Sequence, residues 1–71
     1  MKYTTTDLWL ASYLVDQGVL LVNYDKKGPG KLQFTFDTTE ETWKKLNISY
    51  LSSDTHKIRQ SIDNLKSLLY Q

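Results

Sequence analysis

The sequence predicts a small α+β domain that spans residues 1–71, in the order helix, strand, strand, helix, helix. Two runs of β-branched and aromatic residues flank a glycine–proline turn, which is the pattern of a β-hairpin. Three other segments place apolar residues three or four positions apart, which is the period of an amphipathic helix. Because no other run indicates a strand, the predicted sheet has two antiparallel strands covered by helices.

The first predicted helix begins at Thr5 or Thr6, whose hydroxyl can accept a hydrogen bond from an amide of the first turn. It ends at Gly18, because glycine enters the left-handed conformation without a steric penalty. The apolar stripe of this helix consists of Leu8, Ala11, Leu14 and Val15.

The hairpin is predicted from residues 19–24 and 32–36, joined by a tip at residues 26–30. The second run alternates apolar and polar residues, so one of its faces is buried and the other is solvated. The first run is continuously apolar over residues 19–22, so both of its faces need cover from helices or from another molecule. Strict alternation places Leu20, Val22 and Tyr24 on one face and Val19, Leu21 and Asn23 on the other.

Two further helices follow the hairpin. The second helix starts near Thr38, which forms a capping-box pattern with Glu41. The third helix covers residues 54–70, and its Arg59 and Asp63 are spaced as an ion pair four residues apart. The apolar faces consist of Trp43, Leu46 and Tyr50 in the second helix and of Ile58, Ile62, Leu65 and Leu69 in the third.

A two-stranded ribbon is only marginally stable in water, so the hairpin must be stabilised by packing against helices or against another sheet. We expect the third helix to cover one face of the hairpin and to reach the first helix. If two hairpins met edge to edge, a four-stranded sheet with two-fold symmetry would form. The sequence therefore favours a homodimer or a higher oligomer.

Composition limits the classes of function. The formal net charge is +1, from nine basic and eight acidic residues, whereas nucleic-acid-binding domains typically have a strong basic excess. The absence of cysteine excludes disulfides and thiolate metal sites, and it fits a reducing cytoplasm. No window approaches the roughly 18 apolar residues of a membrane span. We therefore expect a cytoplasmic protein that does not enter the membrane.

The sequence lacks a catalytic signature. Its single histidine, His56, lies near Asp54 at the start of the third helix, and it is interpreted as an exposed surface residue. A metal site needs three or four ligands, and a nucleophile needs a base within hydrogen-bond reach. Neither arrangement is indicated by any spacing in the chain. We therefore predict that the protein is not an enzyme and uses no metal or cofactor.

Two sets of residues are candidates for binding. Aromatic and apolar side chains are typical of protein interfaces, and lysines close to aromatic residues can hold single-stranded nucleic acid or a nucleotide. The lysine-rich tip does not have the spacing of a P-loop. The candidates for protein contact are Trp9, Tyr13, Val19, Leu21 and Tyr24. The alternative nucleotide site consists of Lys26, Lys27, Lys31, Lys44 and Lys45.

Three features together resemble a family of short uncharacterised domains from bacteria and phages. They are residues 6–14 followed by Gly18, the pair Phe34 and Phe36, and the closing Leu-Lys-Ser-Leu-Leu of residues 65–69. The resemblance covers most of the chain and implies an intracellular bacterial or phage setting, but it implies no functional residue. We expect a non-enzymatic module that acts through protein–protein interaction, in regulation or against host defence. The alternative is a nucleic-acid or nucleotide binder that uses the basic hairpin tip.

Overall fold

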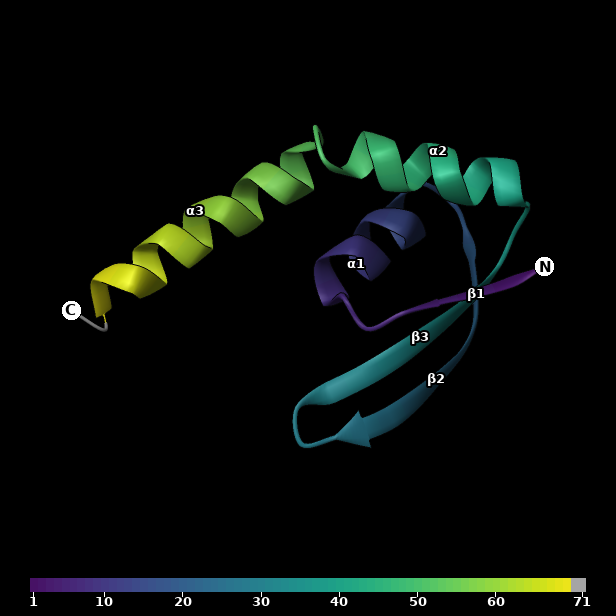
Figure 1. Ribbon diagram of the computed structural model, residues 1–71, viewed down its shortest axis with the longest axis horizontal. Coiled ribbons are helices and arrows are strands. Elements are labelled where there is room, and N and C mark those ends of the chain that lie inside the picture. The colour runs from purple at the N-terminus through teal and green to yellow at the C-terminus, as the bar shows by residue number, and fades with distance from the viewer. Residues whose placement is uncertain (70–71) are drawn as a thin grey trace.

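The computed structural model describes residues 1–69 and contains a three-stranded antiparallel sheet and three helices (Figure 1). The predicted α+β class and the three helices are confirmed, but the prediction of a two-stranded sheet is wrong. Tyr70, the last residue of the third predicted helix, lies outside the described residues. The elements are β1 (Lys2–Thr5), α1 (Leu8–Asp16), β2 (Leu20–Gly28), β3 (Lys31–Asp37), α2 (Glu40–Tyr50) and α3 (Asp54–Leu69).

The additional strand is β1, which pairs with β3 and gives the strand order β1-β3-β2. The register places Lys2 opposite Asp37 and Thr5 opposite Phe34. At the start of β1 the terminal ammonium lies 3.2 Å from the Asp37 carboxylate, and the Thr38 amide donates to the Met1 carbonyl at 3.0 Å. The hairpin is therefore stabilised on one edge by the chain's own N-terminus, and β2 remains an edge strand.

The hairpin is longer and its turn tighter than the sequence predicted. Gly28 pairs with Lys31 across a turn formed by Pro29 and Gly30, whereas a tip of five residues was expected. Gly30 has a φ of +68°, which suits the third position of a type II turn after proline. The predicted tip residue Lys26 consequently lies within β2.

A β-bulge at Val22 changes which side chains of β2 share a face. The register passes from the pair Leu21–Phe36 directly to the pair Asn23–Thr35, so Val22 is the extra residue. Residues directly opposite each other in an antiparallel pair point to the same side. The pairs Leu21–Phe36 and Tyr24–Phe34 therefore lie on one face, and the predicted grouping of Tyr24 with Leu20 and Val22 is wrong.

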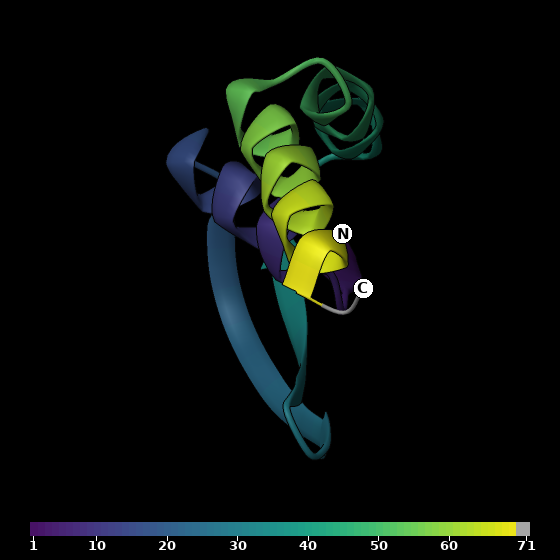
Figure 2. The same cartoon turned by 90° about the vertical axis from the view of Figure 1, so that its left-hand side faces the viewer.

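The core lies between this face of the sheet and the helices. Phe36, in the central strand, is fully buried, and the Tyr3 ring stacks on the Trp43 ring with 4.9 Å between centroids. In Figures 1 and 2 the helices lie on one side of the strands, and α1 contacts β1, α2 and α3. The buried residues are Leu10, Ala11, Tyr13, Leu14, Phe36 and Tyr50, and Trp9, Val19, Phe34, Trp43 and Leu46 pack around them.

The helix ends show how local sequence sets these boundaries. Asp7, rather than Thr5 or Thr6, caps α1, because its carboxylate accepts from the Trp9 amide at 2.9 Å and the Leu10 amide at 3.2 Å. Thr5 supports this cap by accepting from the Asp7 amide at 3.1 Å. The predicted end at Gly18 is confirmed by its φ of +88°.

The buried face of α1 is rotated relative to the predicted stripe. Ala11 and Leu14 are buried as expected, but Leu8 and Val15 are exposed. Leu10 and Tyr13 are buried in their place. The exposed pair therefore forms an apolar margin along α1. The N-cap of α2 is Thr39, one residue after the predicted Thr38. The Thr39 hydroxyl accepts a hydrogen bond from the Thr42 amide at 3.1 Å.

The third helix projects away from the sheet (Figure 1), so the prediction that it covers the hairpin is wrong. Its main contacts are with α1. The molecule is consequently elongated, with principal extents of 44 × 29 × 15 Å. The apolar stripe of α3 is left without a complete cover, since Ile58, Leu65 and Leu68 are all exposed.

Candidate binding surfaces

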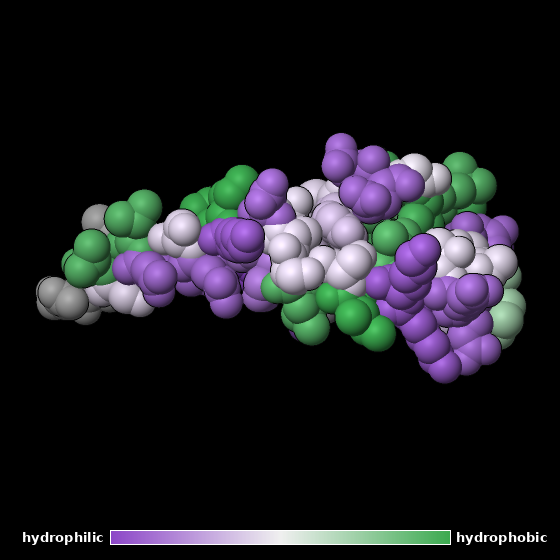
Figure 3. Space-filling view, turned by 90° about the horizontal axis from the view of Figure 1, so that it is seen from above, coloured by the Kyte–Doolittle hydropathy of each residue, from purple (hydrophilic) through white to green (hydrophobic). Residues whose placement is uncertain are grey.

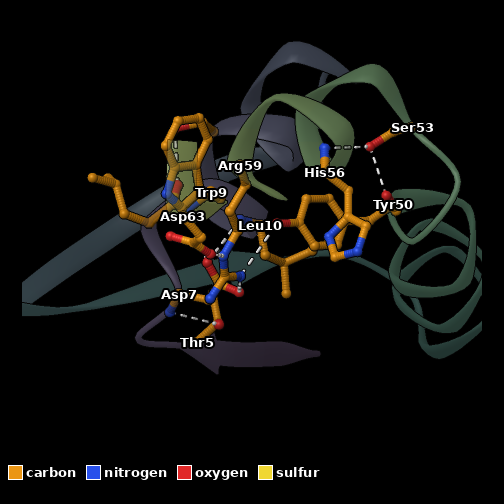
Figure 4. A network of polar contacts seen from close by, with 11 residues as sticks. Thr5, Asp7, Trp9, Leu10, Tyr50, Ser53, His56, Arg59 and Asp63 are labelled. Atoms are coloured by element: carbon orange, nitrogen blue, oxygen red, sulfur yellow. Dashed lines mark hydrogen bonds and ion pairs between the residues drawn. The ribbon is translucent and has the colours of Figure 1, made fainter. Parts of the chain in front are cut away.

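A polar network joins the beginnings of α1 and α3 (Figure 4). The Arg59 guanidinium donates to Asp7 Oδ2 at 2.7 Å and to the Tyr50 hydroxyl at 3.4 Å. Asp7 Oδ1 caps α1, so one carboxylate serves both helices. The hydrogen bonds to Tyr50 and to Asp7 raise the pKa of Arg59 above its ordinary value. This network therefore joins the first half of α3 to the N-cap of α1 and to the end of α2.

The sequence indicated only part of this network. It pointed to Asp63 as the partner of Arg59, and Asp63 Oδ2 lies 4.0 Å from Arg59 Nε. The closer partner is Asp7, which is separated from Arg59 by 52 positions in the chain. The local signal that could have identified Asp7 is its place directly before the first apolar residue of α1, which is the usual position of an N-cap.

His56 lies at the junction of α2 and α3 and is partly buried, not exposed as interpreted from the sequence. Its ring meets the Tyr50 ring edge-on, with 5.1 Å between centroids. Its Nδ1 atom is buried and has no hydrogen-bond partner within the described structure. Among residues 1–69 there is no group of three or more histidine, cysteine, aspartate or glutamate side chains placed to hold a metal ion. His56 therefore acts here as a packing residue.

The lysines of the alternative nucleotide site fall into two separate groups. Lys26, Lys27 and Lys31 lie at the end of the hairpin, whereas Lys44 and Lys45 belong to α2 on the opposite side of the molecule (Figure 1). The Lys44 ammonium is 2.9 Å from the Glu40 carboxylate. The fold therefore does not combine the five lysines into one site.

The residues predicted for protein contact differ in their exposure. Tyr13 is only 9% exposed, and its hydroxyl is 2.8 Å from the Ser49 hydroxyl. Trp9 and Val19 are partly buried and pack against the core. Leu21 and Tyr24 are exposed on β2. Of the five predicted contact residues, Leu21 and Tyr24 therefore have the most exposed side chains.

An apolar groove runs between α1 and the sheet. It has a volume of about 270 Å³, and a smaller hollow of about 110 Å³ continues it toward the hairpin turn. The two hollows share Leu8 and Phe34, so we treat them as one feature, the α1–sheet groove. The larger part is lined by Leu8, Ala11, Ser12, Val15, Leu21, Phe34 and Phe36. The smaller part is lined by Thr6, Leu8, Gly30, Lys31, Leu32 and Phe34.

The sequence did not predict this groove. The interpretation of Leu8 and Val15 as core residues assigned them to the covered side of the first helix, whereas they form one wall of the groove. The other wall depends on the bulge at Val22, which keeps Leu21 beside Phe36. A bulge of this kind has no signal in the alternation of residues.

Two further apolar surfaces are open to solvent. The β2 edge, defined here as residues 20–24, contains Leu20, Val22 and Tyr24 and has no strand beside it in the described structure. The α3 stripe, defined as Ile58, Ile62, Leu65 and Leu68, lies on the projecting helix, and Figure 3 shows hydrophobic surface along that helix between polar residues. The molecule therefore presents a groove, a strand edge and a helix face that share apolar character.

The chain belongs to the family described as a domain of unknown function (DUF5659), whose model matches residues 1–70. This match confirms the resemblance to a family of short uncharacterised domains. No curated protein and no solved structure matches the chain. Within the described residues, every helix is too short or too polar to cross a membrane.

Proposed function

We propose that this protein is a non-enzymatic binding module that acts through contact with another protein. Support comes from the distribution of apolar side chains among residues 1–69. Six hydrophobic residues are buried, whereas thirteen large hydrophobic residues are exposed. Isolated exposed hydrophobic residues are ordinary, but contiguous apolar surface marks interaction sites. Here four of them, Leu20, Leu21, Val22 and Tyr24, lie within five consecutive positions of one edge strand.

The observation that carries the proposal is the β2 edge. A strand at the edge of a sheet presents unpaired backbone amides and carbonyls, which can pair with an extended segment of another chain. A second bulge lies at Lys27, where the register passes from the pair Lys26–Leu32 to the pair Gly28–Lys31. This bulge and the charges of Lys26 and Lys27 protect the half of β2 near the turn. The half that contains Leu20, Val22 and Tyr24 has no charged residue. The expected partner is an extended segment with apolar side chains, and the bulge at Val22 keeps the added strand short.

The test introduces charge at this edge. The double substitution Leu20→Lys and Val22→Lys adds the residues that natural proteins use to block edge pairing. The matched control is Ile48→Lys on α2, because Ile48 is 72% exposed and lies in another element. Wild type and control should retain the same protein from a lysate of the source organism, in a manner that depends little on salt. The double variant should lose it, and equal retention by all three would contradict the proposal.

The alternative is a nucleotide or nucleic-acid binder that uses the end of the hairpin. The strand register supports this alternative in one respect. Tyr24 and Lys26 are two positions apart in β2, so their side chains share a face, and Lys31 lies close by at the start of β3. An aromatic ring beside lysines can stack a base while the charges hold phosphate. Replacing Lys26, Lys27 and Lys31 by alanine should then abolish binding of a single-stranded oligonucleotide, and wild-type affinity should fall steeply with salt. Affinity unaffected by salt would exclude this alternative.

A further inference from the structure

We propose that the α3 stripe of one chain docks into the α1–sheet groove of a second copy, so that two chains exchange their C-terminal helices around a two-fold axis. This inference concerns a self-contact and does not depend on the binding function proposed for the β2 edge. It assigns one occupant to two apolar surfaces that the single chain leaves open.

Within residues 1–69, the α3 stripe is not completely covered by other side chains of its own chain. Leu65 and Leu68 are 63% and 61% exposed, and the main contacts of α3 are made with α1. An isolated helix shorter than about 12–15 residues is marginal in water, and most helices in proteins are stabilised by packing of their apolar face. The projecting turns of this 16-residue helix therefore lack the contact that usually stabilises such a segment.

The chain's own groove is not accessible to its own α3. The Arg59–Asp7 pair, at 2.7 Å, and the hydrogen bond from Arg59 to Tyr50 fix the first half of α3 beside the start of α1. From this anchor α3 extends away from the sheet, as Figure 1 shows. A groove in another molecule can receive the exposed side of α3 without disturbing the anchor, because Ile58, Leu65 and Leu68 remain exposed while Arg59 is paired.

The groove has the chemistry and the capacity for aliphatic side chains. Its larger part has a volume of about 270 Å³. An apolar cavity of about 150 Å³ holds one benzene-sized group, so this space can receive at least one leucine-sized side chain. The Ser12 hydroxyl, which lines the groove, already donates to the Leu8 carbonyl at 2.9 Å. Docking would therefore leave this hydroxyl with its partner.

The two surfaces also match in length. From Ile58 to Leu68 the helix rises about 15 Å, at 1.5 Å per residue. From Phe36 to Lys31 the groove follows β3 for about 17 Å, at about 3.4 Å per residue. The apolar part of α3 and the floor of the groove can therefore coincide over nearly their whole extent.

The area of contact favours a second copy over a helix from another protein. About 12 residues of a helix that is roughly 12 Å wide make a footprint of roughly 200 Å², or about 400 Å² when both surfaces are counted. A specific interface needs about 1,000 Å². A single docked helix reaches less than half of this area, whereas reciprocal exchange doubles it to about 800 Å² as a flat footprint. Two copies therefore come closer to this area than a single docked helix does, and the interface that they form is a weak one.

The first test measures mass by light scattering at about 100 μM, because an interface of this size lies at the weak end of the range. Wild type should have the mass of two 8.3 kDa chains. Leu65→Asp on the helix and Leu8→Asp on the groove should each weaken self-association about 100-fold or more, because a carboxylate would be buried among apolar groups. Ile48→Asp, on α2 outside both surfaces, should remain dimeric.

A second measurement locates the contact and does not depend on the aspartate variants folding correctly. Because the chain contains no cysteine, single-cysteine variants give unambiguous cross-links. A mixture of Leu65→Cys and Leu8→Cys chains should form a mixed disulfide under mild oxidation, and it should do so much faster than a mixture of Ile48→Cys and Leu8→Cys chains. A monomeric wild type at about 100 μM would overturn the proposal. Equal cross-linking in the two mixtures, or dimers that persist in both aspartate variants, would also overturn it.

Discussion

The inner part of the molecule, where α1, α2 and β3 meet, differs from the outer part formed by β2 and the projecting half of α3. In the inner part apolar side chains are buried, and the Tyr13 and Ser49 hydroxyls lie 2.8 Å apart. In the outer part apolar side chains such as Leu20 and Leu65 face solvent. Both parts follow regular secondary structure, so the difference lies in packing. We therefore expect the inner part to account for most of the stability and the outer part to be the place where a partner makes contact.

The largest expected effect comes from the centre of the inner part. Phe36 is 0% exposed and lies on the central strand. Phe36→Ala should lower the free energy of unfolding by about 3–5 kcal/mol, because it removes buried apolar surface and leaves a cavity. Urea denaturation followed by circular dichroism measures this loss. A loss below about 1 kcal/mol would show that the inner part is not the stabilising region.

A smaller effect is expected where the inner part anchors the outer helix. Asp7→Ala removes both the cap of α1 and the partner of Arg59, so we expect a loss of about 1–2 kcal/mol in the free energy of unfolding. Asp7→Asn keeps a capping oxygen and removes only the charge pair, which is partly exposed, so its loss should stay below about 1 kcal/mol. Denaturation of both variants at low and high salt separates the two contributions. Equal losses in the two variants would contradict the capping role of Asp7.

The smallest effect is expected on the outer strand. Tyr24 is 64% exposed, and Tyr24→Thr replaces it by another residue that favours strands. The free energy of unfolding should change by no more than about 0.5 kcal/mol. The same substitution should weaken binding of a partner at the β2 edge. A large loss of stability would place Tyr24 in the inner part and remove it from the proposed contact surface.

The sequence was sufficient for the elements whose signals are local. Helical spacing identified all three helices, and Gly18 correctly marked the end of α1. The strand β1 was missed because it contains only four residues, Lys-Tyr-Thr-Thr, and pairs with residues far along the chain. Neither the length nor the alternation of so short a run separates it from a loop.

The candidate surfaces were harder to predict, because they depend on which side of each element meets its neighbours. Leu8 fits the periodic stripe of α1, yet the packing of Leu10 and Tyr13 rotates the helix and leaves Leu8 on the groove. The stripe of α3 was predicted from its period, and the side chain of its last member, Leu69, lies outside the described structure. The sequence did not indicate the contact between Arg59 and Asp7, which joins this helix to the start of α1. Such contacts between distant residues have no periodic signal.

Amide hydrogen exchange of α3 as a function of protein concentration tests most directly whether the outer part is a contact surface. Docking in a second copy should slow exchange at residues 62–68 as the concentration rises, because association stabilises the bound form by mass action. Amides of α1 that are already protected by the inner part should change less. If residues 62–68 exchange equally fast at all concentrations up to the millimolar range, the α3 stripe is not covered by a second copy and the account of the outer part is contradicted.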